Sequence, residues 1–182
     1  MNVDVPILTT ERLLLRPNRM EDFEAYAAFY ATDRATYRGG IKSKIEAFLM
    51  FSAEIGHWYL RGYGFWAIEE KATGTYCGQV GLWNPEGWPA PEVGWLLMNG
   101  FEGRGYAYEA AVRARAYAYD TLGWSEIASC IFEGNRSSIR LAERIGAHLE
   151  RRAKRDGRPD MLVYRHPSPA ELASGETVGG QS

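Results

Sequence analysis

The chain has 182 residues and a mass of 20.5 kDa, which is the usual size of one domain with a full hydrophobic core. Its apolar fraction of 46%, charged fraction of 24% and mean hydropathy of -0.35 exclude a disordered, collagenous or membrane-embedded chain. A net charge of -2 lacks the basic excess that counterion release on nucleic acid requires. We therefore expect a soluble folded protein with neither a nucleic-acid partner nor a membrane partner.

The cysteines and histidines are few and scattered. Cys77 and Cys130 lie far apart without a CxxC pair, and the three histidines are isolated, so we expect neither a disulfide framework nor a metal site. The first residues lack the segments of a secretory signal, and no apolar run approaches the roughly 18 residues of a membrane span. These features predict a protein of the reducing cytoplasm.

The first half of the chain predicts one strand, two helices and a hairpin. Thr9–Arg16 alternates like a strand, and Asp22–Ala31 carries apolar residues at helical spacing. Ser43 and Glu46 have the spacing of a capping box, which opens a second helix that ends near Leu60. Two β-like runs around a polar turn and a loop rich in Pro and Gly follow: Gly64–Glu70, Thr75–Trp83 and Asn84–Pro91.

The second half predicts a central strand, a long helix and a strand-rich end. Glu92–Met98 has the pattern of a strand buried on both faces, and the helix Tyr106–Leu122 follows and ends at Gly123. We expect Glu109 and Arg113 to pair on the exposed face of this helix. A stripe of small residues on the same helix consists of Ala107, Ala110, Ala111, Ala114 and Ala118. The remaining elements are Glu126–Ile131 (strand), Arg136–Ile145 (helix), and Ala147–Lys154 and Met161–Tyr164 (strands) around the turn Asp156–Pro159.

This order of elements predicts a mixed α/β sheet with an antiparallel body. We expect one domain over residues 1–165, because the length of the chain fits a single domain. Residues 166–182 are rich in Pro, Ser and Gly, which predicts a flexible C-terminal tail.

The most informative segment is the Gly-rich turn Gly100–Gly105 between the central strand and the long helix. Free backbone N–H groups and the positive end of a helix dipole meet there, which favours a phosphate group. A Walker P-loop would need Lys directly after Gly105, where Tyr106 stands, and a dinucleotide fingerprint would need Gly or Ala in place of Tyr108. The pattern instead favours a pyrophosphate cradle of the coenzyme A type.

Four segments, in order, resemble the GNAT N-acetyltransferase superfamily. They are TERLLLRP at Thr10–Pro17, GYGFWAIEEKATGTYCGQVGLWNPEGWP at Gly62–Pro89, GRGYAYEA at Gly103–Ala110 after EVGWLL, and NRSSIRLAERIGA at Asn135–Ala147. The chain looks like the branch that contains the ribosomal-protein alanine N-acetyltransferases. The resemblance implies the GNAT fold, a mostly antiparallel sheet with flanking helices in which two central parallel strands, Glu92–Met98 and Glu126–Ile131, splay apart.

The resemblance also implies acetyl-CoA as co-substrate, without a metal. Main-chain groups of the central strand would bind the pantetheine arm, and one N–H near Leu97 or Met98 would polarise the thioester carbonyl. The Gly-rich turn would bind the pyrophosphate, and Asn135, a good N-cap residue as it stands, would also contact the cofactor. The cofactor-binding residues expected from the resemblance are Leu96, Leu97, Met98, Gly103, Arg104, Gly105, Tyr106, Ala107 and Asn135.

Two positions depart from the superfamily pattern and bear on catalysis. Gly100 stands where Gln or Arg is frequent, and Ala142 stands where many members have a general-acid tyrosine. Ser138 then becomes the candidate that protonates the departing thiolate, and Glu92 is the candidate base. By resemblance, Trp58 and Trp88 are candidates for the wall of the acceptor pocket, although most aromatic residues of the chain are expected in the core.

The implied reaction is direct transfer of acetyl from acetyl-CoA to a primary amine, either a protein N-terminus or a small molecule, in a ternary complex. The segments expected around the acceptor carry few acidic residues, which disfavours a polyamine. A non-catalytic acyl-CoA-binding sensor and a partner-binding domain with a vestigial site are the alternatives. The sequence leaves the oligomeric state open, with a homodimer among the candidate states.

Overall fold

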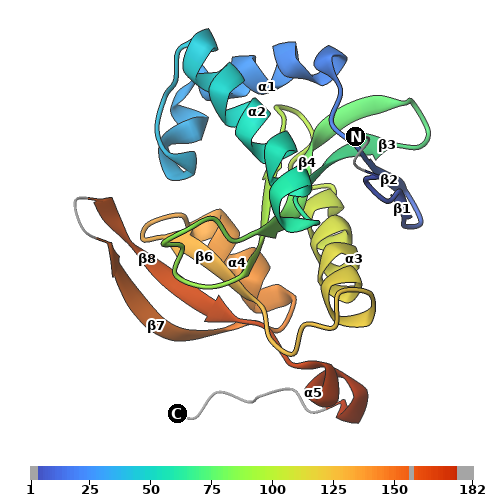
Figure 1. Ribbon diagram of the computed structural model, residues 1–182, viewed down its shortest axis with the longest axis vertical. Helices are drawn as coiled ribbons and strands as arrows, with labels where there is room; N and C mark the ends of the chain where they lie inside the picture. The colour runs from blue at the N-terminus through green and yellow to red at the C-terminus, as the bar shows by residue number, and fades with distance from the viewer. Residues whose placement is uncertain (1–3, 156–157, 176–182) are drawn as a thin grey trace. The chain divides into compact units, whose positions relative to one another are not determined.

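The computed structural model describes residues 4–155 and 158–175, and Figure 1 shows its elements. The chain divides into two compact units, the first made of Met1–Trp83 and Gly94–Ala114 and the second of Asn84–Val93 and Arg115–Ser182. The strands are β1 (Leu8–Thr9), β2 (Leu13–Arg16), β3 (Phe65–Glu70), β4 (Thr75–Trp83), β5 (Glu92–Leu97), β6 (Ala128–Phe132), β7 (His148–Arg155) and β8 (Arg158–Arg165). The α-helices are α1 (Phe23–Tyr30), α2 (Lys44–Arg61), α3 (Tyr106–Asp120), α4 (Arg136–Arg144) and α5 (Pro169–Ser174), and the 3-10 helices are η1 (Met20–Asp22) and η2 (Asp33–Arg38).

The described residues form an eight-stranded mixed sheet in the order β1-β2-β3-β4-β5-β6-β8-β7. Neighbours from β1 to β4 run antiparallel, as do β6 with β8 and β8 with β7. Strands β5 and β6 run parallel. The sequence prediction of a mixed α/β sheet with an antiparallel body and a central parallel pair is therefore confirmed.

Most of the predicted elements are present with boundaries shifted by one to three residues. The capping box of Ser43 and Glu46 starts α2, and Gly123 follows α3 with a left-handed φ of 70°. The predicted first strand was wrong in one respect, because the structure breaks it into β1 and β2. Thr10 causes the break, since its N–H donates to the Leu13 carbonyl at 3.0 Å and its hydroxyl accepts the Leu13 N–H at 2.9 Å. These bonds close a tight turn.

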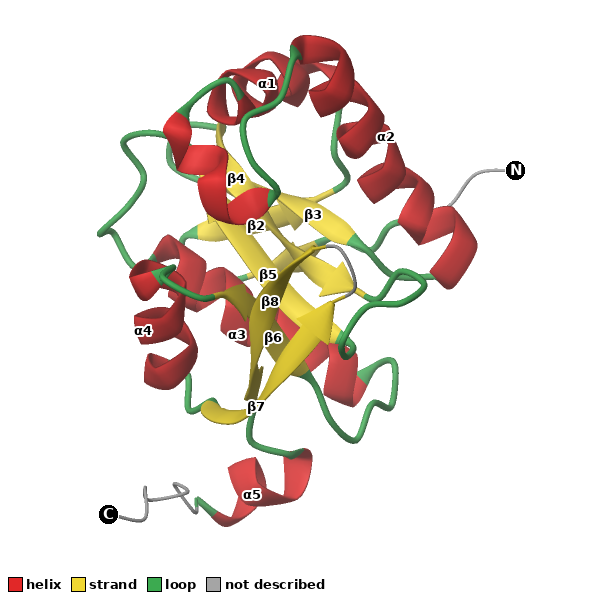
Figure 2. Cartoon of the chain, turned by 90° about the vertical axis from the view of Figure 1, so that its left-hand side faces the viewer, coloured by secondary structure: helices red, strands yellow, loops and turns green. Residues whose placement is uncertain are grey.

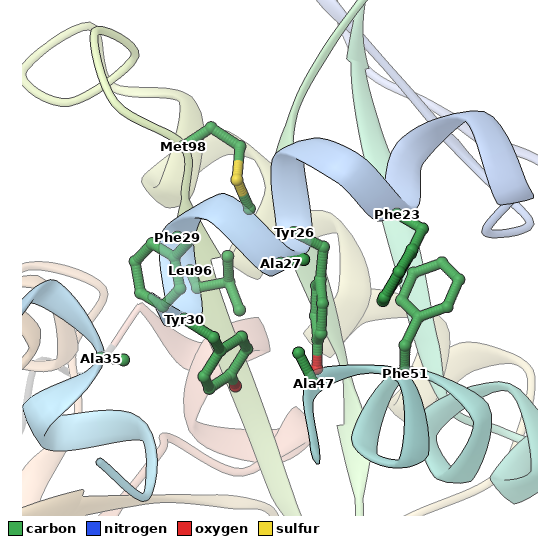
Figure 3. Close-up of a cluster of buried hydrophobic side chains, with 10 residues drawn as sticks. All are labelled: Phe23, Tyr26, Ala27, Phe29, Tyr30, Ala35, Ala47, Phe51, Leu96 and Met98. Atoms are coloured by element: carbon green, nitrogen blue, oxygen red, sulfur yellow. The ribbon is translucent and has the colours of Figure 1, made fainter. Parts of the chain in front are cut away.

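An aromatic cluster in the first unit anchors the end of β5. Its members come from α1, η2, α2 and the segment that ends β5, as Figure 3 shows. The Tyr26 and Phe51 rings lie 5.0 Å apart between their centroids, and Leu96 and Met98, each 5% exposed, belong to the same cluster. Burial of these side chains is the main favourable contribution to holding the strand end in place.

Close backbone contact between β4 and β5 also positions that strand end. The Met98 N–H donates to the Cys77 carbonyl oxygen at 2.8 Å. Beside this bond, a Cβ atom on Gly78 would lie 2.2 Å from the Leu96 carbonyl oxygen, and φ at Gly78 is 151°. Only glycine permits this approach.

In the second unit, β6, β8 and β7 lie side by side (Figure 2). Asp156 and Gly157, predicted in the turn between the last two strands, lie outside the described residues. The predicted tail begins with ordered chain, because His166 is 1% exposed and Ser168 caps α5. Burial lowers the pKa of His166 to about 3, so this imidazole is neutral at physiological pH. Residues 176–182 lie outside the described part of the chain.

No helix in the described part of the chain is both long and apolar enough to cross a membrane. Helix α2, the longest, instead buries one face, and this face contains an acid. Glu54 belongs to this buried face, on which it falls between Phe51 and Trp58, and it is 2% exposed. Burial raises the pKa of Glu54 to about 7, and the guanidinium of Arg38, 3.5 Å away, offsets this only in part.

The raised pKa of Glu54 predicts a pH-dependent stability. The folded protein binds this proton more tightly than the unfolded chain, so its stabilising effect is complete below about pH 4.5 and is lost as the pH rises to about 7. The Glu54→Gln variant should therefore gain about 3 kcal/mol of unfolding free energy relative to wild type across this range. Urea unfolding at a series of pH values measures the difference.

Glu46→Gln is the matched control, because Glu46 is exposed on the same helix and Gln also completes a capping box. Its difference from wild type should stay constant between about pH 5 and 8. A Glu54→Gln difference that also stays constant would contradict the assignment.

Candidate active site

The expected site residues fall into two groups, one in each unit. The first unit contains Trp58, Leu96, Leu97, Met98, Gly103, Arg104, Gly105, Tyr106 and Ala107. The second unit contains Trp88, Glu92, Asn135 and Ser138.

The Gly-rich turn presents backbone donors at the start of α3. Gly103 and Gly105 have φ of 75° and 82°, a left-handed conformation that favours glycine. The Glu109 N–H donates to the Gly105 carbonyl at 3.1 Å, so the N–H groups of the preceding turn have no partner within the helix. N–H groups gathered at a helix N-terminus suit the oxygens of a pyrophosphate.

Glu109, in the first turn of α3, ties this turn to the β1–β2 connection. Its carboxylate accepts bonds from the Arg12 N–H at 2.8 Å, from Arg12 Nε at 2.7 Å and from the Thr10 hydroxyl. Arg12 Nη1 also donates to the Arg104 carbonyl oxygen at 2.9 Å, inside the turn. The predicted pairing of Glu109 with Arg113 was therefore wrong, because a partner distant in sequence holds this carboxylate. We call these bonds the Glu109 clamp.

The clamp also keeps Glu109 ionised. Burial on its own would raise the pKa of Glu109, but the hydrogen bonds from Thr10 and Arg12 outweigh it and lower the pKa below the usual value. The hydrogen bond between the Arg12 and Glu109 side chains also raises the pKa of the Arg12 guanidinium. The clamp is therefore fully charged at neutral pH.

A second set of polar contacts lies on the other side of the turn. The Tyr106 hydroxyl donates to the Glu70 carboxylate and lowers its pKa, and Arg104 Nη1 lies 3.6 Å from the same carboxylate. The Arg104 guanidinium lies over the Phe101 ring, 5.1 Å from its centroid, and its side chain is 51% exposed. Arg104 thus supplies an accessible positive charge beside the backbone donors.

The end of β5 offers a specific main-chain donor. Because Met98 donates its N–H to β4, that group is already used within the sheet. Neighbouring residues of a strand direct their N–H groups to opposite edges, so the Leu97 N–H faces away from β4. Arg34 Nη2 donates to the Leu97 carbonyl oxygen at 2.9 Å. Of the two expected oxyanion donors, Leu97 is the one that the hydrogen bonding favours.

In the second unit, side chains replace backbone bonds between β5 and β6. The register pairs Glu92 with Ala128, and the Glu92 carboxylate then accepts the Cys130 N–H at 2.8 Å. The Ser129 hydroxyl donates to the Val93 carbonyl at 2.7 Å. Parallel strands that continued to pair would use backbone groups at these positions. Glu92, 4% exposed, therefore has a structural bond as well as its expected catalytic role.

Helix α4 begins as the sequence predicts. The Asn135 side-chain oxygen accepts the Ser138 N–H at 3.3 Å and the Ser137 hydroxyl at 2.9 Å, which confirms Asn135 as the N-cap. The amide nitrogen of Asn135 is then the group suited to a cofactor contact. Ser138 lies in the first turn, and Ala142, at the usual tyrosine position, is fully buried.

The two tryptophans predicted for the acceptor pocket have different environments. Trp58 is 4% exposed, packs edge-on against Trp66 with 4.8 Å between ring centroids, and donates its indole N–H to the Phe65 carbonyl at 3.0 Å. It is a core residue of the first unit. Trp88 is half-buried in the loop between β4 and β5, where its backbone N–H donates to the Pro85 carbonyl at 3.1 Å.

Neither cysteine has the environment of a nucleophile. Burial raises the pKa of the Cys77 thiol to about 11. Burial and the neighbouring Glu92 carboxylate raise the pKa of Cys130 still further. Both are free thiols that stay protonated at neutral pH.

Sequence reasoning missed two polar features of the first unit. Glu54 had a readable signal, because it occupies the helical spacing of the buried residues Ala47, Phe51 and Trp58. The contact between Arg12 and Glu109 left no signal in the sequence, because 97 residues separate the two partners.

Comparison with known proteins shows the family to which this chain belongs. The acetyltransferase (GNAT) domain family matches residues 12–148. The uncharacterized protein YkkB of Bacillus subtilis is 33% identical over 172 residues, which span 88% of this chain and 95% of YkkB. The crystal structure of an acetyltransferase from Agrobacterium tumefaciens has a TM-score of 0.84 and 40% identity, and covers 92% of this chain and 98% of its own. RimL, a ribosomal L7/L12 alpha-N-protein acetyltransferase solved in complex with coenzyme A, shares the fold, with a TM-score of 0.69 at 19% identity over 91% of this chain and 99% of its own.

The mixed sheet with its central parallel pair, and the Gly-rich turn between β5 and α3, match the GNAT acetyltransferase fold, which uses acetyl-CoA as co-substrate. The chain belongs to the GNAT family, as the match over residues 12–148 and the identity with YkkB show. The expected fold and enzyme class are confirmed.

The geometry of the Gly-rich turn predicts how substitutions at Gly105 change the affinity for acetyl-CoA. We expect micromolar binding of acetyl-CoA to wild type, and binding weakened at least about 10-fold more by Gly105→Asp than by Gly105→Asn. Asn has nearly the same shape as Asp and tolerates the left-handed φ of 82°. Both side chains place a Cβ atom 3.3 Å from Arg12 Nη2, so the two variants differ in the charge that they add beside the pyrophosphate. Calorimetric titration measures both. Equal affinities of the two folded variants would place the pyrophosphate elsewhere.

Proposed function

We propose that the protein transfers acetyl directly from acetyl-CoA to a primary amine, either a protein N-terminus or a small-molecule amine, in a ternary complex. The observation that carries the proposal is the Gly-rich turn at the start of α3, whose backbone the Glu109 clamp holds in place and whose Arg104 side chain is accessible. In this reaction the amine nitrogen attacks the thioester carbonyl carbon, a C–N bond forms, and the C–S bond breaks to release coenzyme A.

The geometry within each unit supports the cofactor roles that the resemblance implies. The N–H groups of Gly103–Ala107 bind the pyrophosphate and Arg104 adds charge, while Asn135 contributes its amide nitrogen. Leu96–Met98 line the pantetheine arm, with the Leu97 N–H as the donor to the thioester oxygen. An oxyanion donor of this type stabilises a transition state by a few kcal/mol. Acetyl-CoA supplies the activated acyl group.

Proton transfer is assigned to Glu92 and Ser138. Glu92 takes a proton from the amine, directly or through a water molecule, and Ser138 protonates the departing thiolate. An α-amine, with a pKa of about 7.7 to 8.0, needs this base less than a lysine amine near 10.4. Buried Glu92 and the absence of a tyrosine at Ala142 support these roles.

The acceptor that we favour has one amine and an apolar or peptide-like body. RimL, by its name, acts on a protein N-terminus, and this chain shares its fold. Trp88 is the aromatic candidate for contact with the acceptor, while Trp58 supports the pocket from the core. We place the reaction in the cytoplasm, where both free thiols stay reduced.

A screen of amines with acetyl-CoA tests the proposal, with released coenzyme A thiol as the readout. The panel contains peptides with a free N-terminus, monoamines, lysine and spermidine. We expect turnover with peptides or monoamines. Acetyl-CoA binding without turnover on any amine would favour the acyl-CoA sensor, and loss of both would favour a partner-binding domain with a vestigial site.

The Glu92→Gln variant tests the base. Gln retains an oxygen that can accept the Cys130 N–H, so the variant removes basicity while keeping the strand junction. We expect a loss of at least about 100-fold in kcat near pH 6, where unassisted amine is scarce, and a smaller loss as the pH rises through the pKa of the amine. The exposed Glu133→Gln is the control. A loss independent of pH would make Glu92 a positioning residue instead.

The Ser138→Ala variant tests the acid. We expect kcat to fall by at least about 10-fold while the affinity for acetyl-CoA stays nearly constant. Ser125→Ala, at an exposed serine of the same unit, should leave both unchanged. Parallel losses of turnover and affinity in Ser138→Ala would assign this serine to cofactor binding.

A further inference from the structure

Helix α2 presents an apolar face to solvent along its whole length. Six large side chains of the helix are 41% to 79% exposed: Ile45, Phe48, Leu49, Ile55, Tyr59 and Leu60. Phe48, at the edge of this set, also packs edge-on against Phe23 of α1. The spacing of the six residues places them on one side of the helix, opposite the buried residues Ala47, Phe51, Glu54 and Trp58. The charged residues outside the buried side lie near the ends, at Lys44, Glu46 and Arg61. We call the six apolar residues with Ser52 and Gly56 the outer face of α2.

A contiguous apolar face of this kind marks an interaction surface, because single exposed apolar residues are normal but an unbroken stripe is not. With about 200 Å² of surface for a large apolar residue, the exposures leave roughly 700 Å² on the outer face. Each partner of a standard protein interface contributes about 800 Å². The area of the outer face is therefore close to what one partner of a stable dimer contributes.

We propose that the outer face of α2 is the contact between two copies of this chain, in which the two helices cross antiparallel. Ser52 and Gly56, four residues apart, are small and lie at the centre of the face, with the large residues around them. Small central residues let two helix backbones approach closely. A two-fold axis there makes the contact self-complementary, since the same surface serves both copies.

The antiparallel arrangement also brings together opposite ends of the two helix dipoles. It places Phe48 and Leu49 against Leu60 and Tyr59 of the second copy at both ends of the contact. The N-terminal end of each helix dipole lies beside the C-terminal end of the other. A parallel crossing would bring like ends together.

Sedimentation velocity of the full chain tests the proposal. We expect a particle of twice the 20.5 kDa chain mass for wild type at micromolar concentration. Leu49→Glu and Leu60→Glu should each raise the dimer dissociation constant at least about 100-fold, because each buries a charge against an apolar surface. Met20→Glu is the matched control, since Met20 is 60% exposed on η1, outside α2, and this variant should remain dimeric.

A gain-of-signal experiment covers the case in which the glutamate variants do not fold. Equal amounts of Ser52→Cys and Gly56→Cys protein, mixed and oxidised, should give disulfide-linked dimers of the two variants, whereas Ser52→Cys mixed with Met20→Cys should not. A wild-type monomer at about 200 µM, or a dimer unaffected by the α2 variants, overturns the proposal. Binding of a monomeric wild type to lipid vesicles would overturn it as well and assign the face to a membrane.

Discussion

The carboxylate of Glu109 joins the first turn of α3 to the connection between β1 and β2, and the position of the Gly-rich turn depends on this contact. A left-handed glycine turn has little side-chain packing of its own, so its position must be fixed by other bonds. Arg12 supplies them, because it binds Glu109 with its backbone and side chain and also binds the Arg104 carbonyl. Charged partners make these hydrogen bonds stronger than neutral ones. The turn thereby keeps its donors oriented without a ligand, and preorganised donors are what the proposed binding of a pyrophosphate requires.

Specific contacts also fix the position of both ends of β5. Gly78 allows β4 to approach so closely that Met98 bonds to the Cys77 carbonyl, and this leaves the Leu97 N–H directed to the other edge. At the start of the strand, the Glu92 and Ser129 side chains take over bonds that backbone groups would make in a regular parallel pair. Side chains thus end the pairing, which fits the strand separation that the GNAT resemblance implies. Glu92 has two assignments on this account, a structural bond and a proton-transfer role.

The fold was predictable because its signals are local. Helical spacing, the capping box of Ser43 and the glycine after α3 each lie within a few residues, and the order of elements then limits the sheet to few topologies. What the sequence could not show were contacts between distant segments. The prediction for Glu109 chose Arg113, its neighbour by helical spacing, whereas the structure pairs it with Arg12. The turn at Thr10 was missed because an alternating pattern does not reveal a hydroxyl that accepts a backbone N–H. The outer face of α2 illustrates a third kind of limit, since a sequence that predicts an amphipathic helix does not say which apolar side faces the core.

The central claim is that the Gly-rich turn binds the cofactor through backbone N–H groups that the Glu109 clamp holds in place. Amide NMR spectra of the nitrogen-15-labelled protein, recorded during titration with coenzyme A, test it directly. The account predicts that the largest amide shifts fall on Gly103–Ala107 and on Leu97. Saturable binding that leaves those amides unmoved, while shifts gather elsewhere in the chain, would contradict it.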